Sequence, residues 1–540
     1  MSLNVADDIN LAARLARWAR LQPERIAVRF ESDAISYGEL DRRVDSLAAG
    51  LAAAGVRAGE FVCVLFETSI DYVATWLALT RLGAVEAPIN TGFRGPGLAH
   101  ALRLTGATRL LVDHTLAAEA WAVLPDVPGV REVFVRGGPS SAPAGASARA
   151  HAFEDLLRGG APPSPAEVRP GDTTMLLFTS GSTGPSKACS IPNRYVLRQP
   201  EIFCQELRVG CTDTLYAPFP LFHADGAIFT VAAALAAGAT AALAPRFSVR
   251  GFWDDCRRHE ATHFDFMGAT LAMLFKQPPG PRDREHGLRI GWGVPSPPWS
   301  EAFEERFGVE LLEVYGLSDA GIVLYNRPGA EKRPGSCGRP AAPFDLRLQD
   351  ANGDDVPVGE VGELVIRPRE PHLVLNGYHG DAAATADAFR DLWFHTGDLM
   401  RRDTDDYFYF VGRLKDVIRR RGENISAFDV EQALLTHPDV LEVAAYGVPS
   451  ELTEEDLMVA VRPRTGVSLD PRDVVDWAAG RLASHMVPRY VRLCPELPRT
   501  ETEKVAKHLL KALGVTPDTH DFDPRAARPA PQPETRPNAD

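Results

Sequence analysis

Hydrophobic residues between positions 37 and 89 switch between helical and strand spacing. From Tyr37 to Ala54 they recur every three or four residues, which predicts a helix with one buried face. The unbroken apolar run Phe61–Phe66 then predicts a buried strand. A second helix near Tyr72–Leu82 and a short strand near Ala84–Ile89 follow. Because strands that alternate with helices form parallel sheets covered by those helices, we predict an α/β fold.

The pattern changes after Gly335. Short strands such as Phe344–Gln349 and Gly362–Arg367 are separated by Gly, Asp and Pro, which predicts a smaller β-rich subdomain. A chain of 540 residues is also too long for a single hydrophobic core. We therefore expect a large amino-terminal domain of several subdomains with layered βαβ sheets and the β-rich part (1–414), a small α+β domain (415–514) and a disordered tail poor in large apolar side chains (515–540).

The composition narrows the range of functions. Apolar residues make up 45% of the chain and charged residues 24%, as in globular proteins, and the net charge of -14 disfavours nucleic acid as a partner. The seven cysteines are scattered without metal-ligand spacing, so we expect reduced thiols in the cytoplasm, no zinc and no disulfide. Residues 1–10 do not resemble a secretory signal. The uncharged, alanine-rich segment 227–244 predicts a buried helix, a glycine stop and a buried strand rather than an integral membrane span.

The loop LFTSGSTGPSK, from Leu177 to Lys187, grows directly out of an apolar run. Seven of the eight residues from Thr179 to Ser186 are Thr, Ser or Gly. Unpaired backbone N–H groups and hydroxyls at a strand end suit phosphate oxygens, so we predict that a nucleotide triphosphate binds here. The phosphate loop of common NTPases does not fit, because it needs Ser or Thr after the lysine, where this chain has Ala188. A flexible surface turn is the plain alternative.

Six further blocks follow this loop in a fixed order: PLFHADG (220–226), GWGVPSP (291–297), YGLSDAG (315–321), WFHTGD (393–398), FVGRLKDVIRRRGENIS (410–426) and LPRTETEKV (497–505). Together with the loop they resemble the adenylate-forming superfamily of acyl-CoA synthetases, peptide-synthetase adenylation domains and luciferases. Carnitine/crotonobetaine-type acyl-CoA ligases look most similar. The resemblance spans nearly the whole chain and implies ATP- and Mg²⁺-dependent activation of a small-molecule acid as acyl-AMP, with pyrophosphate release. Transfer of the acyl group to the thiol of coenzyme A would follow.

The resemblance also implies roles for residues that bind the nucleotide. Tyr315, next to Gly316, would stack on adenine, Ser318 would meet the α-phosphate, and Asp319 would hold Mg²⁺ together with Thr179. Asp398 would bind both ribose hydroxyls, with Arg413 as the second ribose contact. The β- and γ-phosphates would be held by Thr179, Ser180, Gly181, Ser182, Thr183, Gly184 and Lys187, and the adenine wall would be formed by Gly293, Val294 and Pro295. Trp292 beside that wall is explained equally well by core packing.

Other implied roles concern the acid and its acceptor. Lys504 matches the catalytic lysine that bridges the α-phosphate and the substrate carboxylate, and Lys415 matches the hinge. His223 matches a gate between the acyl site and the thiol tunnel, although a packed core histidine is the plain alternative. Arg421, Gly422 and Glu423 would face coenzyme A, unless the arginine run is a solvated surface. The acyl pocket, whose walls suit a small or medium acid, would contain Phe222, His223, Gly226, Phe266, Met267, Gly268, Gly316 and Leu317.

Several positions depart from the family pattern. Ser318 and Asp319 replace Thr and Glu, and Glu503 stands where glycine is usual before the lysine. Together with Trp292 and Ala188, these departures keep a second hypothesis open. In it, the enzyme belongs to secondary metabolism and activates nitrite for diazotisation of an aryl amine, or forms an amide. A third hypothesis, a non-catalytic nucleotide-binding scaffold, is disfavoured by the joint presence of Lys187, Asp398, Arg413 and Lys504. The identity of the acid, the acceptor and the oligomeric state stay open, and a homodimer is among the possibilities.

Overall fold

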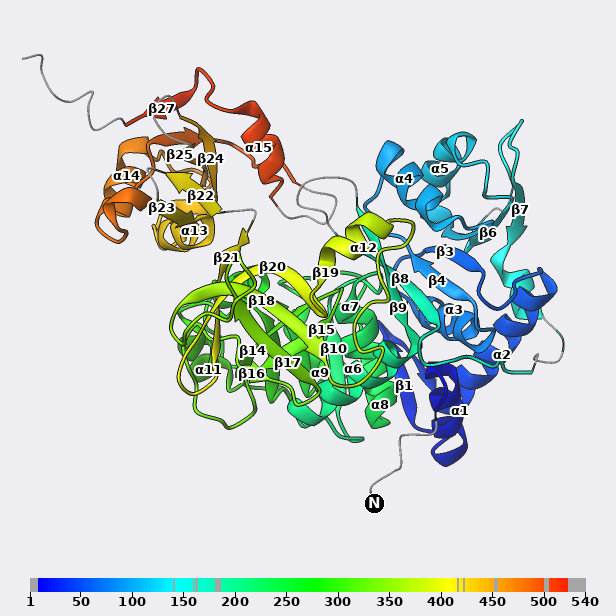
Figure 1. The fold of residues 1–540 in the computed structure, drawn as a ribbon. Helices are drawn as coiled ribbons and strands as arrows, with labels where there is room; N and C mark the ends of the chain where they lie inside the picture. Colours follow the sequence, from blue (N-terminus) through cyan, green and yellow to red (C-terminus); the bar gives the residue numbers. More distant parts are fainter. Residues whose placement is uncertain are drawn as a thin grey trace, which may run out of the picture. The chain divides into compact units, whose positions relative to one another are not determined.

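The computed structural model describes residues 8–138, 141–158, 160, 164–179, 186–414, 417–420, 423–450, 455–499 and 505–522. Contacts divide the chain into two compact units. The first unit comprises Met1–Thr396 and Arg401–Phe410, and the second comprises Gly397–Met400 and Val411–Asp540. The predicted α/β class is confirmed, since helices cover largely parallel sheets in the first unit (Figure 1).

A seven-stranded sheet occupies the amino-terminal part of the first unit, in the order β7-β6-β5-β3-β4-β8-β9. All its neighbours are parallel except the hairpin of β8 and β9. Helices α4 and α5 cover one face, and α2 and α3 lie on the other (Figure 1). The strands are β3 (Phe61–Leu65), β4 (Val85–Pro88), β5 (Arg109–Asp113), β6 (Glu132–Arg136), β7 (Arg149–Ala152), β8 (Thr173–Thr179) and β9 (Lys187–Pro192). The helices are α2 (Tyr37–Ala53), α3 (Ile70–Arg81), α4 (Gly95–Thr105), α5 (His114–Val123), η2 (Leu124–Asp126) and η3 (Phe153–Arg158).

Local sequence accounts for the first of the predicted helices. Helix α2 begins after Ser36, whose hydroxyl accepts a hydrogen bond from the backbone of Glu39 while the Glu39 carboxylate accepts one from the backbone of Ser36. This capping box satisfies donors that the first turn of a helix leaves unpaired. The bounds of α2, β3, α3 and β4 confirm the elements predicted near residues 37–54, 61–66, 72–82 and 84–89, within two residues at each end.

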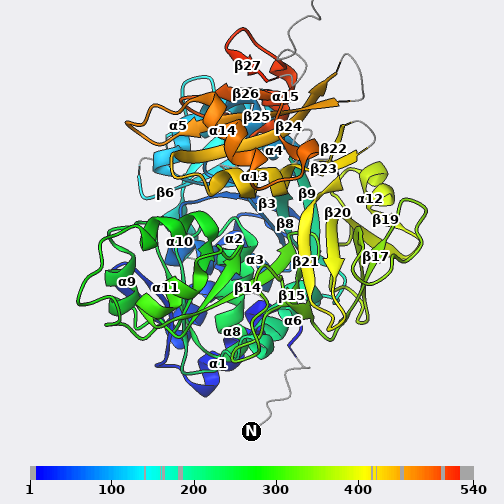
Figure 2. The ribbon, with the colours of Figure 1, turned by 90° about the vertical axis from the view of Figure 1, so that its left-hand side faces the viewer.

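A nine-stranded sheet follows, in the order β16-β15-β14-β13-β12-β10-β11-β1-β2. Its inner strands are parallel, and β2, β15 and β16 are antiparallel at the edges. Helices α9, α10 and α11 lie together on one face (Figure 2), whereas α6 and η4 pack on the other. The strands are β1 (Ile26–Phe30), β2 (Asp33–Ser36), β10 (Thr214–Ala217), β11 (Thr240–Leu243), β12 (His263–Met267), β13 (Ile290–Val294), β14 (Glu310–Leu317), β15 (Gly321–Tyr325) and β16 (Arg339–Pro340). The helices are α1 (Leu11–Leu21), α6 (Asn193–Glu206), α7 (Ala224–Gly226), the π-helix η4 (Ala227–Ala232), α8 (Ala233–Ala237), α9 (Phe252–Arg258), α10 (Gly268–Phe275) and α11 (Ser300–Phe307).

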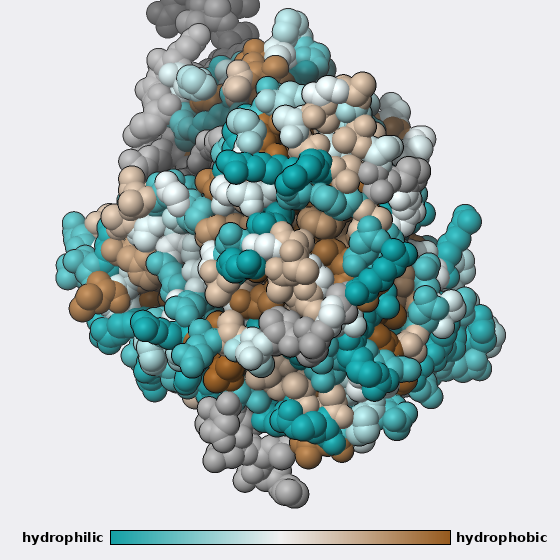
Figure 3. All heavy atoms as spheres, turned by 90° about the vertical axis from the view of Figure 1, so that its right-hand side faces the viewer, coloured by the Kyte–Doolittle hydropathy of each residue, from teal (hydrophilic) through white to brown (hydrophobic). Residues whose placement is uncertain are grey.

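The alanine-rich segment 227–244 forms η4, α8 and β11, with Gly238 ending α8 at a φ of 68°. The predicted buried helix, glycine stop and buried strand are therefore confirmed. Within the described part of the chain, no helix is long and apolar enough to cross a bilayer. On the face shown in Figure 3, hydrophilic and hydrophobic residues are interspersed.

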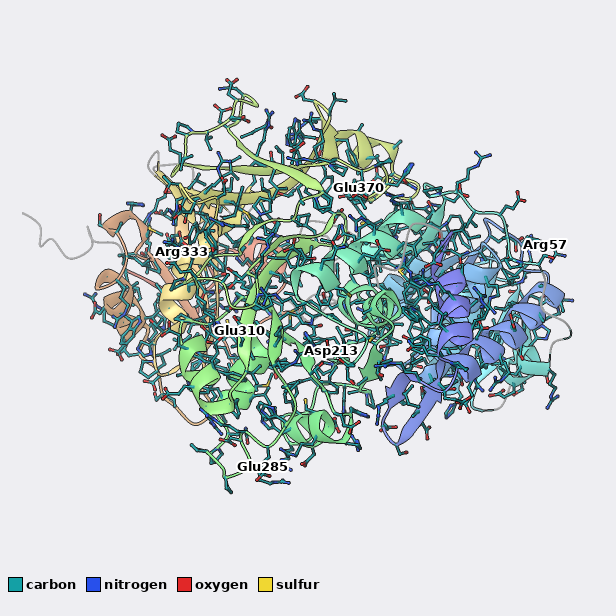
Figure 4. The ribbon with its side chains drawn as sticks, turned by 90° about the horizontal axis from the view of Figure 1, so that it is seen from below. Arg57, Asp213, Glu285, Glu310, Arg333 and Glu370 are labelled. Carbon is teal, nitrogen blue, oxygen red and sulfur yellow. The ribbon has the colours of Figure 1, made fainter. Side chains whose placement is uncertain are left out.

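The β-rich subdomain predicted after Gly335 is a five-stranded sheet in the order β17-β18-β20-β19, with β21 paired to β20. Glu370, labelled in Figure 4, follows β18 and pairs with Arg194 and Arg198 of α6 at 3.1 and 3.0 Å. These ion pairs tie the subdomain to the helix that also covers the nine-stranded sheet. Its elements are β17 (Phe344–Gln349), β18 (Val361–Pro368), α12 (Ala382–Ala388), β19 (Phe389–Arg390), β20 (Trp393–Arg402) and β21 (Phe408–Arg413).

The second unit contains a two-stranded sheet, β22-β23, and a four-stranded sheet, β24-β25-β26-β27. Residues 515–522 were predicted to belong to a disordered tail, and this part of the prediction is wrong, because β27 pairs antiparallel with β26 and Asp521 pairs with Arg489 at 3.0 Å. Residues 523–540 lie outside the described residues. The elements are β22 (Val417–Arg420), β23 (Glu423–Ser426), α13 (Ala427–Leu435), β24 (Val440–Pro449), β25 (Glu455–Pro463), α14 (Pro471–Ala479), η6 (Ser484–Met486), β26 (Tyr490–Leu493), α15 (Lys507–Leu513) and β27 (Thr519–Asp521).

A buried carboxyl group on β14 supports the loop that follows β13. Glu313 is 9% exposed and accepts a hydrogen bond from the backbone N–H of Ser296 at 2.8 Å. Burial is the main cause that raises the pKa of Glu313 to about 7, and the Ser296 N–H opposes the shift. Between pH 4.5 and about 7 the folded protein therefore keeps a proton that the unfolded chain has already released.

This difference predicts that the free energy of unfolding falls as the pH rises through that window, by up to about 1.4 kcal/mol per pH unit. Glu313→Gln removes the titrating group, so its free energy of unfolding should fall less over the same range. Urea denaturation at pH values of about 5, 6 and 7.5 measures both slopes. Glu301→Gln, at an exposed position of α11, is the matched control and should behave as the wild type does. Equal slopes for Glu313→Gln and the wild type would contradict the prediction.

Candidate functional site

The hairpin of β8 and β9 carries both ends of the predicted phosphate loop. Thr179 ends β8 and Lys187 begins β9, and the two residues are direct partners across the hairpin. The Thr179 hydroxyl donates to the Lys187 carbonyl at 3.4 Å. Nine predicted site residues lie outside the described residues: Ser180, Gly181, Ser182, Thr183, Gly184, Lys415, Arg421, Gly422 and Lys504.

Tyr378 connects Lys187 with Asp319. Its hydroxyl donates to Oδ1 of Asp319 at 2.6 Å, and the Lys187 ammonium lies 4.8 Å from the centre of its ring. A cation over an aromatic face is attracted by the negative face of the ring, so the lysine is held beside the carboxylate. Burial, with Asp319 as the second cause, raises the pKa of the Tyr378 hydroxyl, which therefore stays protonated and acts as a donor. Tyr378 stands in none of the sequence motifs, and only its contacts mark it.

Asp319 is held by its surroundings on several sides. The Cys189 thiol lies 3.5 Å from the same Oδ1 atom, and the backbone N–H of Leu375 donates to the Asp319 carbonyl at 2.8 Å. The Tyr195 hydroxyl donates to the carbonyl of Ser318 at 3.1 Å, which fixes the turn between β14 and β15. Burial is the main cause that raises the pKa of Cys189, and the carboxylate of Asp319 adds to it, so the thiol is protonated.

The Asp319 carboxylate suits a hard cation such as Mg²⁺. Both side-chain contacts go to Oδ1, and Oδ2 takes part in neither. Among the residues that the structure describes, no group of three or more His, Cys, Asp or Glu side chains could hold a metal ion. Asp319 would therefore hold such an ion together with groups of the bound nucleotide, because Mg²⁺ usually takes only one or two carboxylates from the protein.

The carboxyl ends of β13 and β14 bring the predicted adenine residues together. Gly293 has a φ of 159°, and a Cβ atom there would lie 1.9 Å from the carbonyl oxygen of Phe266, so β12 and β13 approach too closely for a side chain. Val294 and Pro295 are exposed. Tyr315 is 7% exposed, so most of its ring is covered by protein. Trp292 is 2% exposed and packs against other aromatic rings, which decides in favour of core packing.

The predicted acyl-pocket residues fall into two sets. Met267 is 38% exposed at the end of β12, and Gly316 is exposed on β14. Gly268, Leu317 and His223 are half-buried, and the His223 ring lies 4.6 Å from that of Phe222. Phe222 and Gly226 are buried nearby. Phe266 is fully buried in the cluster with α9–α11, which contradicts its prediction as a pocket wall. Strand alternation gives the reason, because the residue that faces the other side of the sheet is Asp265.

The two predicted ribose contacts form an ion pair in the second unit. Nε of Arg413 lies 3.1 Å from Oδ1 of Asp398, whose side chain is 3% exposed. The second unit also uses Arg420 from the basic run, which pairs with Asp456 at 3.2 Å and donates to backbone carbonyls. Arg420 thus serves the packing of its own unit. Glu423 begins β23, where its backbone pairs with that of Arg420.

Comparisons with known proteins agree with these features. Residues 15–379 match the AMP-binding enzyme family, and residues 429–504 match the AMP-binding enzyme C-terminal domain. An indoleacetate–CoA ligase of Aromatoleum aromaticum is 31% identical over 94% of this chain and 98% of its own length. A crotonobetaine/carnitine–CoA ligase of Salmonella choleraesuis is 28% identical over 88% of this chain and 93% of its own.

Solved structures show the same fold. The anthranilate CoA ligase AuaEII in complex with anthranoyl-AMP superposes with a TM-score of 0.85 at 23% identity, covering 95% of this chain and 99% of that one. ATP-bound MatB from Rhodopseudomonas palustris has a TM-score of 0.81 at 24% identity, covering 93% and 99%. The chain belongs to the AMP-binding enzyme family, within the adenylate-forming superfamily that its motifs resemble.

Proposed function

We propose that this protein activates a small-molecule carboxylic acid with ATP, releases pyrophosphate and transfers the acyl group from acyl-AMP to coenzyme A. The observation that carries the proposal is the Lys187–Tyr378–Asp319 arrangement, which places an ammonium and a carboxylate together beside the phosphate loop. A triphosphate with its magnesium ion needs both charges. The two relatives named above are CoA ligases, which supports coenzyme A as the acceptor.

Lys187 would act on the β- and γ-phosphates. Its ammonium attracts the negative charge that grows on pyrophosphate as the bond to the α-phosphorus breaks. The backbone N–H groups and hydroxyls of residues 179–184 would share this charge and orient the leaving group in line with the attacking carboxylate. The Tyr378 ring would keep the lysine in place before ATP arrives.

Asp319 would hold Mg²⁺, which supplies charge neutralisation to the phosphates when bound. Its side chain is one methylene shorter than the glutamate of the family pattern. The Tyr378 hydroxyl fixes one carboxylate oxygen, so the other can keep a constant position despite the shorter reach. Asp398 and Arg413 would bind the ribose, and Lys504 would bridge the α-phosphate and the acid. Lys415 as hinge and Arg421, Gly422 and Glu423 as acceptor contacts complete the proposal.

The direct test is product analysis with the purified protein, ATP, Mg²⁺, coenzyme A and a panel of carboxylic acids, followed by nitrite with aryl amines. We expect AMP, pyrophosphate and an acyl-CoA thioester in equal amounts, identified by mass spectrometry. AMP that forms only with nitrite would replace the proposed function with the diazotisation alternative. ADP and orthophosphate as products would exclude adenylation altogether.

Tyr378→Phe keeps the ring under Lys187 and removes the hydroxyl that holds Asp319. We expect kcat/KM for ATP to fall about tenfold, the size of a lost hydrogen bond to a charged group, and the Mg²⁺ concentration for half-maximal rate to rise. Steady-state pyrophosphate release over a Mg²⁺ titration measures both.

The chain offers a matched control in Tyr409. Its hydroxyl also donates to an aspartate, Asp403 at 2.8 Å, and a cation, Arg401, also lies 4.6 Å from its ring centre. Tyr409→Phe should leave the Mg²⁺ requirement unchanged. If both variants shift it equally, or if neither does, Tyr378 does not position the metal ligand.

Lys504→Ala should abolish adenylate formation by more than about a hundredfold, because the charge that stabilises the transition state is lost. ATP binding, followed by isothermal titration calorimetry, should be weakened far less. Unchanged AMP production by this variant would show that another residue carries the role. Lys507→Ala, on helix α15 of the same unit, controls for loss of a nearby lysine.

A further inference from the structure

A carboxyl group that the sequence motifs do not mark lies inside the first unit. Asp265 occupies the middle of β12 and is 2% exposed. Its neighbours Phe264 and Phe266 belong to the apolar cluster formed with α9, α10 and α11. Successive side chains of a strand point to opposite faces, so Asp265 faces the other side of the sheet.

The contacts of Trp292 show which helices cover that other side of the sheet. Asp265 and Trp292 are register partners on the parallel strands β12 and β13, so their side chains share a face. The Trp292 ring lies 4.9 Å from that of Phe203 on α6 and 6.1 Å from that of Phe229 on η4. Asp265 therefore points toward the layer built from α6 and η4, which continues from the PLFHADG block.

A second acid belongs to this layer. Asp225 lies in α7, directly before η4, and its carbonyl accepts a hydrogen bond from the Thr230 hydroxyl at 2.9 Å. Asp225 therefore precedes the π-helix whose Phe229 ring packs against Trp292, the register partner of Asp265. Consistent with this placement, burial and then the charge of Asp225 raise the pKa of Asp265. The six residues of η4 are π-helical, a rare conformation that is frequently found at functional sites.

The Asp265 carboxyl group is only partly satisfied. Within the described ranges, Oδ2 has no hydrogen-bond partner. Leaving a buried hydrogen-bond acceptor unpaired lowers the folding equilibrium constant roughly ten- to hundredfold. Such an atom next to a predicted acyl pocket is explained if the substrate supplies the missing donor.

On the basis of the proposed function, we propose that Asp265 and Asp225 form a subsite for a primary or secondary amino group on the carboxylic acid substrate. The amino N–H would donate to Oδ2 of Asp265, and a positively charged nitrogen would stabilise the ionised form of the carboxyl group. A quaternary ammonium group carries the charge but offers no N–H, so it leaves Oδ2 unpaired. An acid with a methyl group in place of the amino group lacks both features.

The test compares matched carboxylic acids that differ only at one distal group, which is amino, methyl or trimethylammonio, on aliphatic and aromatic frames. Pyrophosphate release by the full-length enzyme gives kcat/KM for each acid. For the best substrate that carries the amino group, we expect kcat/KM to exceed that of its methyl and trimethylammonio counterparts at least about tenfold. The reason is that a site built to accept an N–H donor rejects analogues without one. Equal values for the matched acids would overturn the proposal.

Two variants connect the preference to the residue. For Asp265→Leu, we expect the ratio of kcat/KM for the amino-bearing acid to kcat/KM for the methyl-bearing acid to fall to one or below, while pyrophosphate release with the methyl-bearing acid persists. Asp265→Asn should reduce this ratio less. Asp255→Asn is the control, because Asp255 lies on α9 and bonds the Tyr216 hydroxyl on the opposite face. A wild-type ratio in both Asp265 variants, with folding verified by circular dichroism, would overturn the subsite. Absence of pyrophosphate with every acid would instead overturn the proposed function and the subsite with it.

Discussion

The hydrogen bond from Tyr378 to Asp319 is the contact on which the candidate nucleotide site depends. It joins the turn after β14 to the segment between β18 and α12, and the ring of the same tyrosine lies against Lys187 at the start of β9. Three segments that are distant in the sequence therefore meet on one side chain. Few side chains offer both an aromatic face and a hydroxyl at this reach, so a single residue sets the separation between the cation and the carboxylate.

The sheets explain why these residues can meet at all. β8 and β9 form a hairpin at one edge of the seven-stranded sheet, and the Asp319 turn follows β14 in the nine-stranded sheet. Helix α6 packs against β9, β15 and η4, so the two sheets share a covering helix. The ion pairs of Arg194 and Arg198 with Glu370 attach the β-rich subdomain to the same helix. The segment that carries Tyr378 follows directly from Glu370, which brings it to the site.

Buried carboxyl groups distinguish the nine-stranded sheet from an ordinary parallel core. Strands covered on both faces usually contain continuous apolar runs, yet β12 carries Asp265 and β14 carries Glu313. Burial raises the pKa of both groups. Glu313 receives an N–H from Ser296 and thereby fixes the loop after β13, whereas Asp265 faces η4 with Oδ2 unpaired among the described residues. The first group serves the scaffold of the site, and the second is the proposed contact for a ligand.

The sequence alone was sufficient for the α/β class, the first helices and strands, the β-rich part and the family, because these depend on local periodicity and on the order of motifs. It also singled out Lys187, Asp319, Asp398 and Arg413 as candidate site residues, since each stands in a motif. It did not identify Tyr378 or Asp265, and it placed Phe266 in the pocket. Those outcomes depend on which face of a strand a side chain occupies and on contacts between distant segments. The strand β27 was missed for the same reason, because its pairing with β26 and the Arg489–Asp521 ion pair are tertiary contacts that a polar, proline-containing sequence does not reveal.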